Sequence, residues 1–156
     1  MIFKIKKRII KIIEFIDSSV PIDFRLKRRL KKKILKKIDL KNLDLRQIDF
    51  SGSNLWNANF RKANLGAADL RNTQLWSADI SNSNLEGAFI QNSNLKRSRL
   101  ENSDFQYATL NNVDLKGADL TNANLSGADL SGADLRGVIF KGAIWSYPGV
   151  EILNDE

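Results

Sequence analysis

The sequence predicts an all-β solenoid, and two regularities in the order of its residues carry this prediction. Every fifth residue from 40 to 140 is Leu, Ile or Phe, without a break, and the residue two places earlier is usually small. A period of five matches neither a β-strand, whose side chains repeat every two residues, nor an α-helix, with 3.6 residues per turn. The period therefore belongs to a supersecondary unit that repeats along the chain.

Each five-residue unit reads as a small residue, Asp or Asn, a large apolar residue and two mostly polar or Gly residues, as in 118–122. The small and the large residue point to the same side of an extended backbone, so each unit offers two inward groups. Gly and Asn at the last place accept tight turns at low cost. A chain that turns in every unit closes on itself and stacks into coils roughly 4.8 Å apart. The central apolar residues are Leu40, Leu45, Phe50, Leu55, Phe60, Leu65, Leu70, Leu75, Ile80, Leu85, Ile90, Leu95, Leu100, Phe105, Leu110, Leu115, Leu120, Leu125, Leu130, Leu135 and Phe140.

The pattern resembles the pentapeptide repeat family, whose consensus is A(D/N)LXX, and the resemblance covers residues 38–144. It implies a right-handed quadrilateral β-helix with four units per coil, so that residues i and i+20 lie one above the other. The repeats would then form about five coils, roughly 25 Å tall at the spacing of neighbouring β-strands.

The first 37 residues differ in composition from the repeats. They contain 14 Lys and Arg and 3 Asp and Glu, whereas residues 38–156 contain 11 and 15. Ile residues at three- and four-residue spacing predict an amphipathic helix over 2–17, and a second helix is expected from about 24 to 37. We therefore expect residues 1–37 to form a basic helical hairpin that caps the N-terminal coil. An open coil end would otherwise expose unpaired backbone and apolar core.

The two ends of the repeat region depart from the pattern. Ile38, Leu43 and Ile48 are large where Ala or Ser is expected, which favours packing against the helical head. At the other end, residues 145–156 are expected to form a cap or tail over the last coil. Their aromatic residues allow a second interpretation, a homodimer through the C-terminal coil.

The second expected helix carries a candidate basic surface on its polar face. A basic amphipathic helix can lie on an anionic membrane, and clustered cations can also bind nucleic-acid phosphates. Alternatively, the charges are only solvated while the apolar face covers the open coil. We favour this second interpretation, because something must cover that end. The residues of the surface are Arg28, Arg29, Lys31, Lys32, Lys33, Lys36 and Lys37.

One outward column, obtained by steps of twenty residues, combines aromatic and basic side chains. It contains Trp56, Trp76, Lys96, Lys116 and Arg136, and is called the stripe below. One interpretation is a partner-binding surface, because Trp and Arg are typical interface anchors. The other is that the two Trp rings stack on each other and cover a corner, with Lys96 in a cation–π contact. The sequence favours neither.

Two other outward residues interrupt the Asp and Asn columns. Arg99 should lie between Asp79 and Asp119, and the simplest interpretation is a surface ion ladder worth about 1 kcal/mol or less per pair. Phe89 replaces the usual Asp or Asn in another column. It marks either an apolar contact point or ordinary surface exposure.

The composition argues against an enzyme. The chain has no Cys and no His, which excludes thiol nucleophiles and imidazole bases. Asp and Asn interchange freely in the repeats, which neither carboxylate catalysis nor metal binding would allow. We therefore expect no catalytic, cofactor or metal site. No signal-peptide pattern and no apolar run of about 18 residues is present, so we expect a cytoplasmic protein, or one peripheral to a membrane through its head.

The leading functional hypothesis is a non-enzymatic scaffold that presents flat, rigid faces to a protein partner of unknown identity. The family resemblance adds another hypothesis, because some pentapeptide repeat proteins resemble DNA in shape and charge and protect DNA gyrase from inhibitors. This sequence departs from that expectation. Residues 38–156 carry a net charge of only −4, Lys and Arg interrupt the acidic columns, and the repeats contain no inserted loop.

Co-sedimentation with vesicles separates the two interpretations of the basic head. We expect the chain to stay in the supernatant with both anionic and neutral vesicles, because the head serves as a cap. Binding to anionic vesicles that a Lys31/Lys32/Lys33→Glu variant loses would contradict this expectation and identify a membrane-targeting element. Duplex DNA as a competitor, at low and high salt, shows whether such binding extends to other polyanions.

Overall fold

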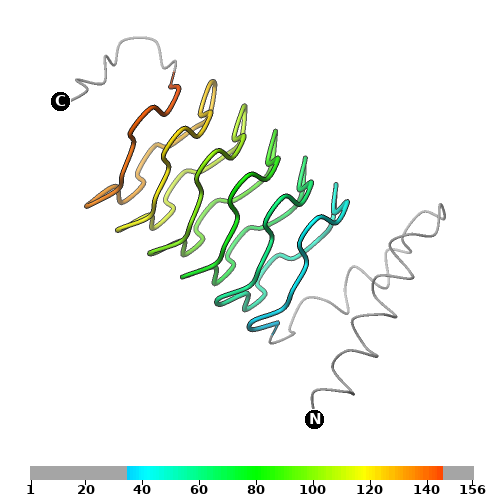
Figure 1. Ribbon diagram of the computed structural model, residues 1–156. Helices are drawn as coiled ribbons and strands as arrows, with labels where there is room; N and C mark the ends of the chain where they lie inside the picture. The colour runs from blue at the N-terminus through cyan, green and yellow to red at the C-terminus, as the bar shows by residue number, and fades with distance from the viewer. Residues whose placement is uncertain (1–34, 146–156) are drawn as a thin grey trace, which may run out of the picture.

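Single residues, rather than long strands, pair between the coils of this protein. The computed structural model describes residues 35–145, which form a rod of stacked four-sided coils (Figure 1). Each unit contributes a parallel β-bridge between residues twenty places apart, from the pair Asp39 and Asn59 to the pair Asn124 and Ile144. Twenty residues hold four units, so the quadrilateral coil is confirmed. Within the described range there is no helix and no strand longer than one bridge residue.

Backbone hydrogen bonds join each coil to the next. The amide of Leu75 donates to the carbonyl of Asn94, and the amide of Ser77 donates to the carbonyl of Lys96, both at 2.8 Å. The amide of Asn94 donates back to the carbonyl of Thr73 at 3.0 Å. Buried backbone N–H and C=O groups need hydrogen-bond partners, and in this rod the neighbouring coil supplies them.

A β-turn follows each large apolar residue. In most turns the amide of the small residue donates to the carbonyl three places earlier, as Ala58 does to Leu55 at 3.0 Å. The third residue of every described turn has a positive φ, between 53° and 71°. This is the geometry of a type II turn, which Gly adopts with least strain. Arg97 and Tyr107 nevertheless occupy the same position, with φ of 53° and 57°.

A side-chain hydrogen bond explains why Asp and Asn interchange in the repeat. The Oδ1 atom of Asp119 accepts from the amide of Thr121 at 2.9 Å, and the Oδ1 atom of Asn84 accepts from the amide of Glu86 at 2.8 Å. A carboxylate and a carboxamide both supply the oxygen that this bond needs. The acid or amide is therefore a structural part of the turn.

The interior is a ladder of stacked apolar side chains. Leu55, Leu75 and Leu95 are fully buried on one side of the rod. Phe50 and Phe60, which are two units and so half a coil apart, meet edge to face with their ring centroids 5.8 Å apart. Burial of these side chains is the main favourable contribution to folding, at about 1.5–3 kcal/mol for each large residue.

The rod begins earlier in the chain than expected. Leu35, Lys36 and Lys37 form a turn of the first coil, and the amide of Lys37 donates to the carbonyl of Trp56 at 2.8 Å. The expectation of a helix up to residue 37 is wrong for these three residues, because their backbone pairs with the next coil. The rest of the expected hairpin lies outside the described residues, as do 146–156, and both stay predictions.

Gly87 and Gly127 offer a matched test of the turn. Both have a positive φ, but a Cβ atom on Gly127 would lie 2.7 Å from the Tyr107 ring, whereas one on Gly87 would meet no atom within 4 Å. We expect Gly87→Ala to lower the free energy of unfolding by about 1 kcal/mol through backbone strain alone. Gly127→Ala should cost more, because the ring must also move, and adding Tyr107→Ala should remove the excess. Urea unfolding measures these differences, and equal losses for the two glycine variants would contradict this account.

Candidate functional site

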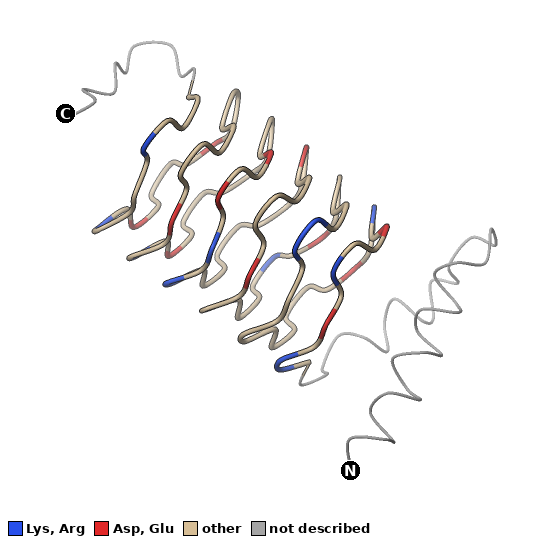
Figure 2. Ribbon diagram, in the orientation of Figure 1, with Lys and Arg blue, Asp and Glu red and all other residues tan. Residues whose placement is uncertain are grey.

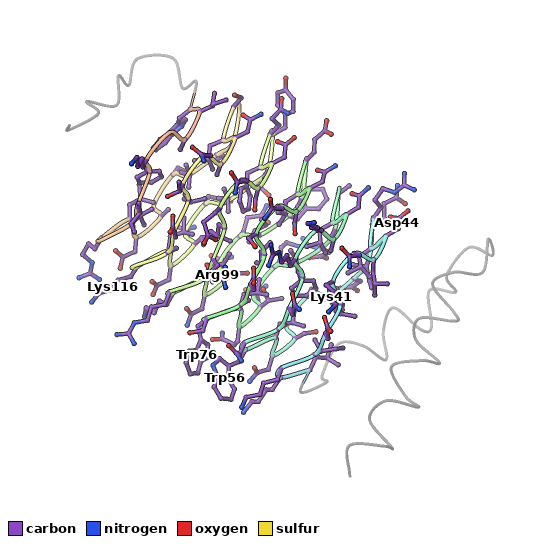
Figure 3. All side chains as sticks on the ribbon, in the orientation of Figure 1. Lys41, Asp44, Trp56, Trp76, Arg99 and Lys116 are labelled. Atoms are coloured by element: carbon purple, nitrogen blue, oxygen red, sulfur yellow. The ribbon has the colours of Figure 1, made fainter. Side chains whose placement is uncertain are left out.

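The structure brings the five stripe residues together along one edge of the rod. The residues two places before them are bridged in succession, from Asn54 to Asp134, so the stripe residues lie one above the other. Figure 3 shows Trp56, Trp76 and Lys116 along this edge. Each stripe residue is the second residue of its turn, and the amide of Trp56 donates to Asn54 Oδ1 at 3.2 Å. The turn therefore fixes the backbone from which each side chain leaves the rod.

The two Trp rings stack on each other. Their centroids are 4.8 Å apart and the ring planes differ by 23°. The ammonium groups of Lys36 and Lys37 lie 5.7 and 5.2 Å from the centroid of the Trp56 ring. Trp56 is half-buried, whereas Trp76 keeps 40% of its surface exposed. The rings thus cover a corner of the rod and still present an apolar surface to solvent.

Lys96 does not make the cation–π contact that was considered for it. Its ammonium group pairs with Asp114 on the next coil, with Nζ 2.7 Å from Oδ2. Arg136 is held in a similar way, since its Nε donates to Asp134 Oδ1 at 2.8 Å. Lys116 makes no ion pair with another described residue. The cations over Trp56 come instead from the first coil, from two lysines that the sequence analysis assigned to the helical head.

The edge around the stripe keeps an excess of positive charge. The turns along this edge carry six cations, and the neighbouring column, two residues earlier in each unit, contributes the carboxylates of Asp114 and Asp134. The six cations are Lys36, Lys37, Lys96, Arg97, Lys116 and Arg136. An approaching negatively charged group therefore meets a basic edge with an apolar section at Trp76.

The expected ion ladder around Arg99 forms only in part. Its Nη1 atom lies 3.4 Å from Asp79 Oδ2, and its Nε atom lies 3.5 Å from Glu101 Oε1. Asp119 instead accepts a hydrogen bond from the Thr121 hydroxyl at 2.6 Å. All these groups are at the surface, so the pairs contribute little stability.

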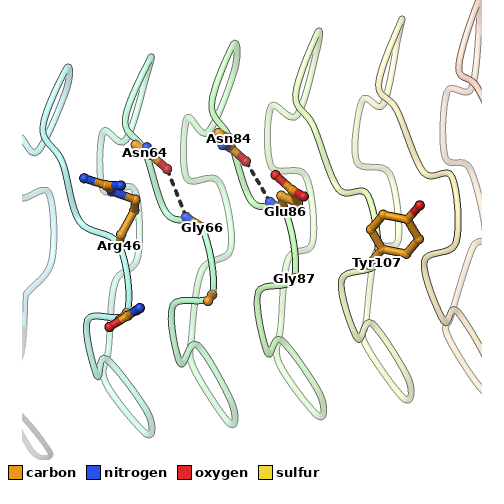
Figure 4. Close-up of a pocket in the computed structure, with 9 residues that line it drawn as sticks. Arg46, Asn64, Gly66, Asn84, Glu86, Gly87 and Tyr107 are labelled. Carbon is orange, nitrogen blue, oxygen red and sulfur yellow. Dashed lines mark hydrogen bonds between the residues drawn. The ribbon is translucent and has the colours of Figure 1, made fainter.

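An open groove on another edge is lined by Arg46, Gly66, Glu86, Gly87 and Tyr107, among others (Figure 4). Some of its polar groups are already engaged, since the Oδ1 atoms of Asn64 and Asn84 accept from the amides of Gly66 and Glu86. The Arg46 guanidinium donates to the Asp44 carboxylate, with Nη2 2.6 Å from Oδ2, and this hydrogen bond lowers the pKa of Asp44. Nothing in the groove suggests a reactive group.

Acidic and basic residues are mixed over the rod (Figure 2). Residues 35–145 contain 13 Lys and Arg and 12 Asp and Glu, which differs from the strongly acidic surface that DNA mimicry requires. No cluster of three or more metal-binding side chains occurs among these residues. Nor does this part of the chain contain a helix long and apolar enough to cross a membrane.

Five-residue units in stacked four-sided coils define a class of β-solenoid proteins. The family model for pentapeptide repeats matches residues 38–76, 78–117 and 103–142, with 8 copies. The chain therefore belongs to the pentapeptide repeat family, and the expected right-handed β-helix solenoid is confirmed.

The chain is similar to several solved pentapeptide repeat structures. Rfr23 from the cyanobacterium Cyanothece 51142 is 25% identical, with a TM-score of 0.48, and the match covers 79% of this chain and 96% of that one. HetL, involved in heterocyst differentiation regulation in Nostoc sp. strain PCC 7120, is 29% identical, with a TM-score of 0.32 and coverage of 74% and 62%. QnrB1, a plasmid-mediated fluoroquinolone resistance protein, is 16% identical, with a TM-score of 0.24 and coverage of 75% and 90%. No curated protein sequence matches the chain.

The pair of Asp134 and Arg136 gives a pH-dependent test of the stripe. The side-chain hydrogen bond from Arg136 is the main reason that the pKa of the Asp134 carboxyl lies well below its ordinary value of 3.8. The pair contributes its full stability at pH values above the ordinary pKa of Asp. This contribution is lost as the pH falls through the lowered pKa of Asp134. We expect Arg136→Gln to raise the Asp134 pKa toward its ordinary value in an NMR titration of the side-chain carboxyl. An unchanged pKa would mean that the backbone amide of Arg136 dominates instead.

Proposed function

We propose that this chain is a non-enzymatic scaffold protein that binds a protein partner through the stripe. The observation that supports the proposal most is the Trp pair, because Trp76 is 40% exposed even though its ring stacks on Trp56. Aromatic anchors of this kind carry much of the binding energy at protein interfaces. The rigid turns hold both rings in place before binding, which lowers the entropy cost of association.

The charges of the stripe support the same function. Lys116 is exposed and makes no ion pair with another described residue, so it is available to a partner carboxylate. Exposed cations of this kind increase the rate of encounter with an acidic partner more than they increase the final affinity. The apolar and the basic parts of the stripe therefore have different roles, anchoring at one end and steering at the other.

We also propose that residues before 35 cover the N-terminal coil, as the expected helical cap would. Ile38 and Ile48 are 6% and 4% exposed although they belong to the first coil. Leu135 and Phe140, near the other end of the rod, are only half-buried. A solenoid needs a cap where its core would otherwise meet solvent. In this arrangement about five coils remain to present the stripe.

Replacing both Trp residues by Ala tests the scaffold proposal. The Trp56→Ala/Trp76→Ala variant should lose about tenfold or more in affinity for a partner of the wild type, because truncating an anchor commonly costs about 2 kcal/mol. Phe89→Ala removes a side chain that is 44% exposed on another side, and it should leave the affinity unchanged.

Partners are captured from a cell lysate by the immobilised wild-type chain, identified by mass spectrometry and measured again with purified protein. Thermal unfolding of both variants provides the control for folding. If every such partner binds the double Trp variant as tightly as the wild type, the proposal fails.

A further inference from the structure

The spacing of the stripe restricts the secondary structure of its partner. Its five residues repeat once per coil, so they are spaced by roughly 4.8 Å and span about 19 Å. An α-helix places residues i, i+4, i+7, i+11 and i+14 on one face over about 21 Å. Residues on one face of an extended strand are about 6.7 Å apart, so five of them span about 27 Å. A helix lying along the rod therefore stays within reach of all five stripe residues, whereas a strand loses register after two.

The order of residues in the stripe restricts the chemistry of the partner. The first two positions are Trp56 and Trp76, and the last three are Lys96, Lys116 and Arg136. A complementary helix would place apolar side chains on its first two positions and carboxylates on its last three. Lys116 makes no ion pair within 35–145, and the exposed pair of Lys96 with Asp114 exchanges partners at little cost because surface ion pairs are weak.

Two other occupants fit less well. A base of single-stranded nucleic acid cannot enter between the two Trp rings, because their centroids are only 4.8 Å apart. A second copy of the rod would match the coil spacing. However, a two-fold contact with parallel rods would bring the cations of one copy against those of the other, and one with antiparallel rods would place Lys96 against Lys96 at its centre.

We propose that the partner presents an acidic α-helix that lies lengthwise along the stripe. Its apolar residues at i and i+4 pack on Trp56 and Trp76, and Asp or Glu residues at i+7, i+11 and i+14 face the three cations. This inference rests on the proposed scaffold function, because it specifies the partner of the same stripe.

Two labelled peptides of equal composition test the inference against the full chain. The first is a side-chain-stapled helix of about 18 residues with Leu at i and i+4 and Glu at i+7, i+11 and i+14. The second places the same Leu and Glu residues at alternate positions and carries no staple. We expect fluorescence anisotropy to show the helical peptide binding about tenfold or more tightly.

Variants of the chain locate the bound helix. Trp56→Ala/Trp76→Ala should weaken binding of the helical peptide about tenfold, and Lys116→Glu about fivefold, with a smaller effect at high salt. Lys62→Glu changes an exposed cation on another edge and should have no effect. Circular dichroism and thermal unfolding confirm that each variant is folded.

The outcomes separate this inference from the scaffold proposal. Equal binding of the two peptides, or no binding of the helical one up to about 1 mM, overturns the helix inference. If the wild type still binds a protein partner and the double Trp variant does not, the scaffold proposal stands although the helix inference has failed. If oligo(dT) displaces the helical peptide and binds more tightly than the peptide does, both the helix inference and the scaffold proposal are wrong. The stripe would then be a nucleic-acid surface.

Discussion

Backbone pairing between residues twenty places apart is the constraint on which the rest of the structure depends. Its bridges run from Asp39 to Ile144, one in every unit. Inward and outward side chains alternate along an extended backbone, so an inserted residue would turn the following apolar side chains toward solvent. Units of five residues without insertion are therefore required by the pairing. The same requirement places chemically unrelated residues, such as Trp76 and Lys96, in one straight column.

The turn separates the residues that build the rod from those that are free to vary. The large and small apolar residues fill the interior, and the Asp or Asn oxygen holds the turn amide, as Asn94 Oδ1 does for the amide of Lys96 at 3.1 Å. The residue whose amide is held can then be Trp, Lys, Arg, Ser or Gly without changing the fold. Function in such a protein is therefore determined by which side chains occupy this position on successive coils.

Inward contacts could be predicted from the sequence more completely than outward ones. The burial of the Leu ladder follows directly from the five-residue period. Among outward residues, stacking of Trp56 and Trp76 was one of two interpretations of their shared column, and the rings do stack. The contact of Lys96 could not be predicted in the same way. Its flexible four-carbon stem reaches both Trp76 and Asp114, and the choice of Asp114 depends on a carboxylate placed diagonally on the next coil. The hydrogen bond of the repeated Asp and Asn was also missed, because an exposed position does not reveal whether its side chain is bonded.

The rod has the connectivity of a one-dimensional stack, since each coil pairs only with the coil before it and the coil after it. A disturbance in one coil can therefore spread only through its neighbours. The Trp56–Trp76 contact joins two adjacent coils, whereas a ligand lying along the stripe would contact five coils at once. Occupancy of the stripe would then resist shear and twist between these five coils together, rather than at one local site.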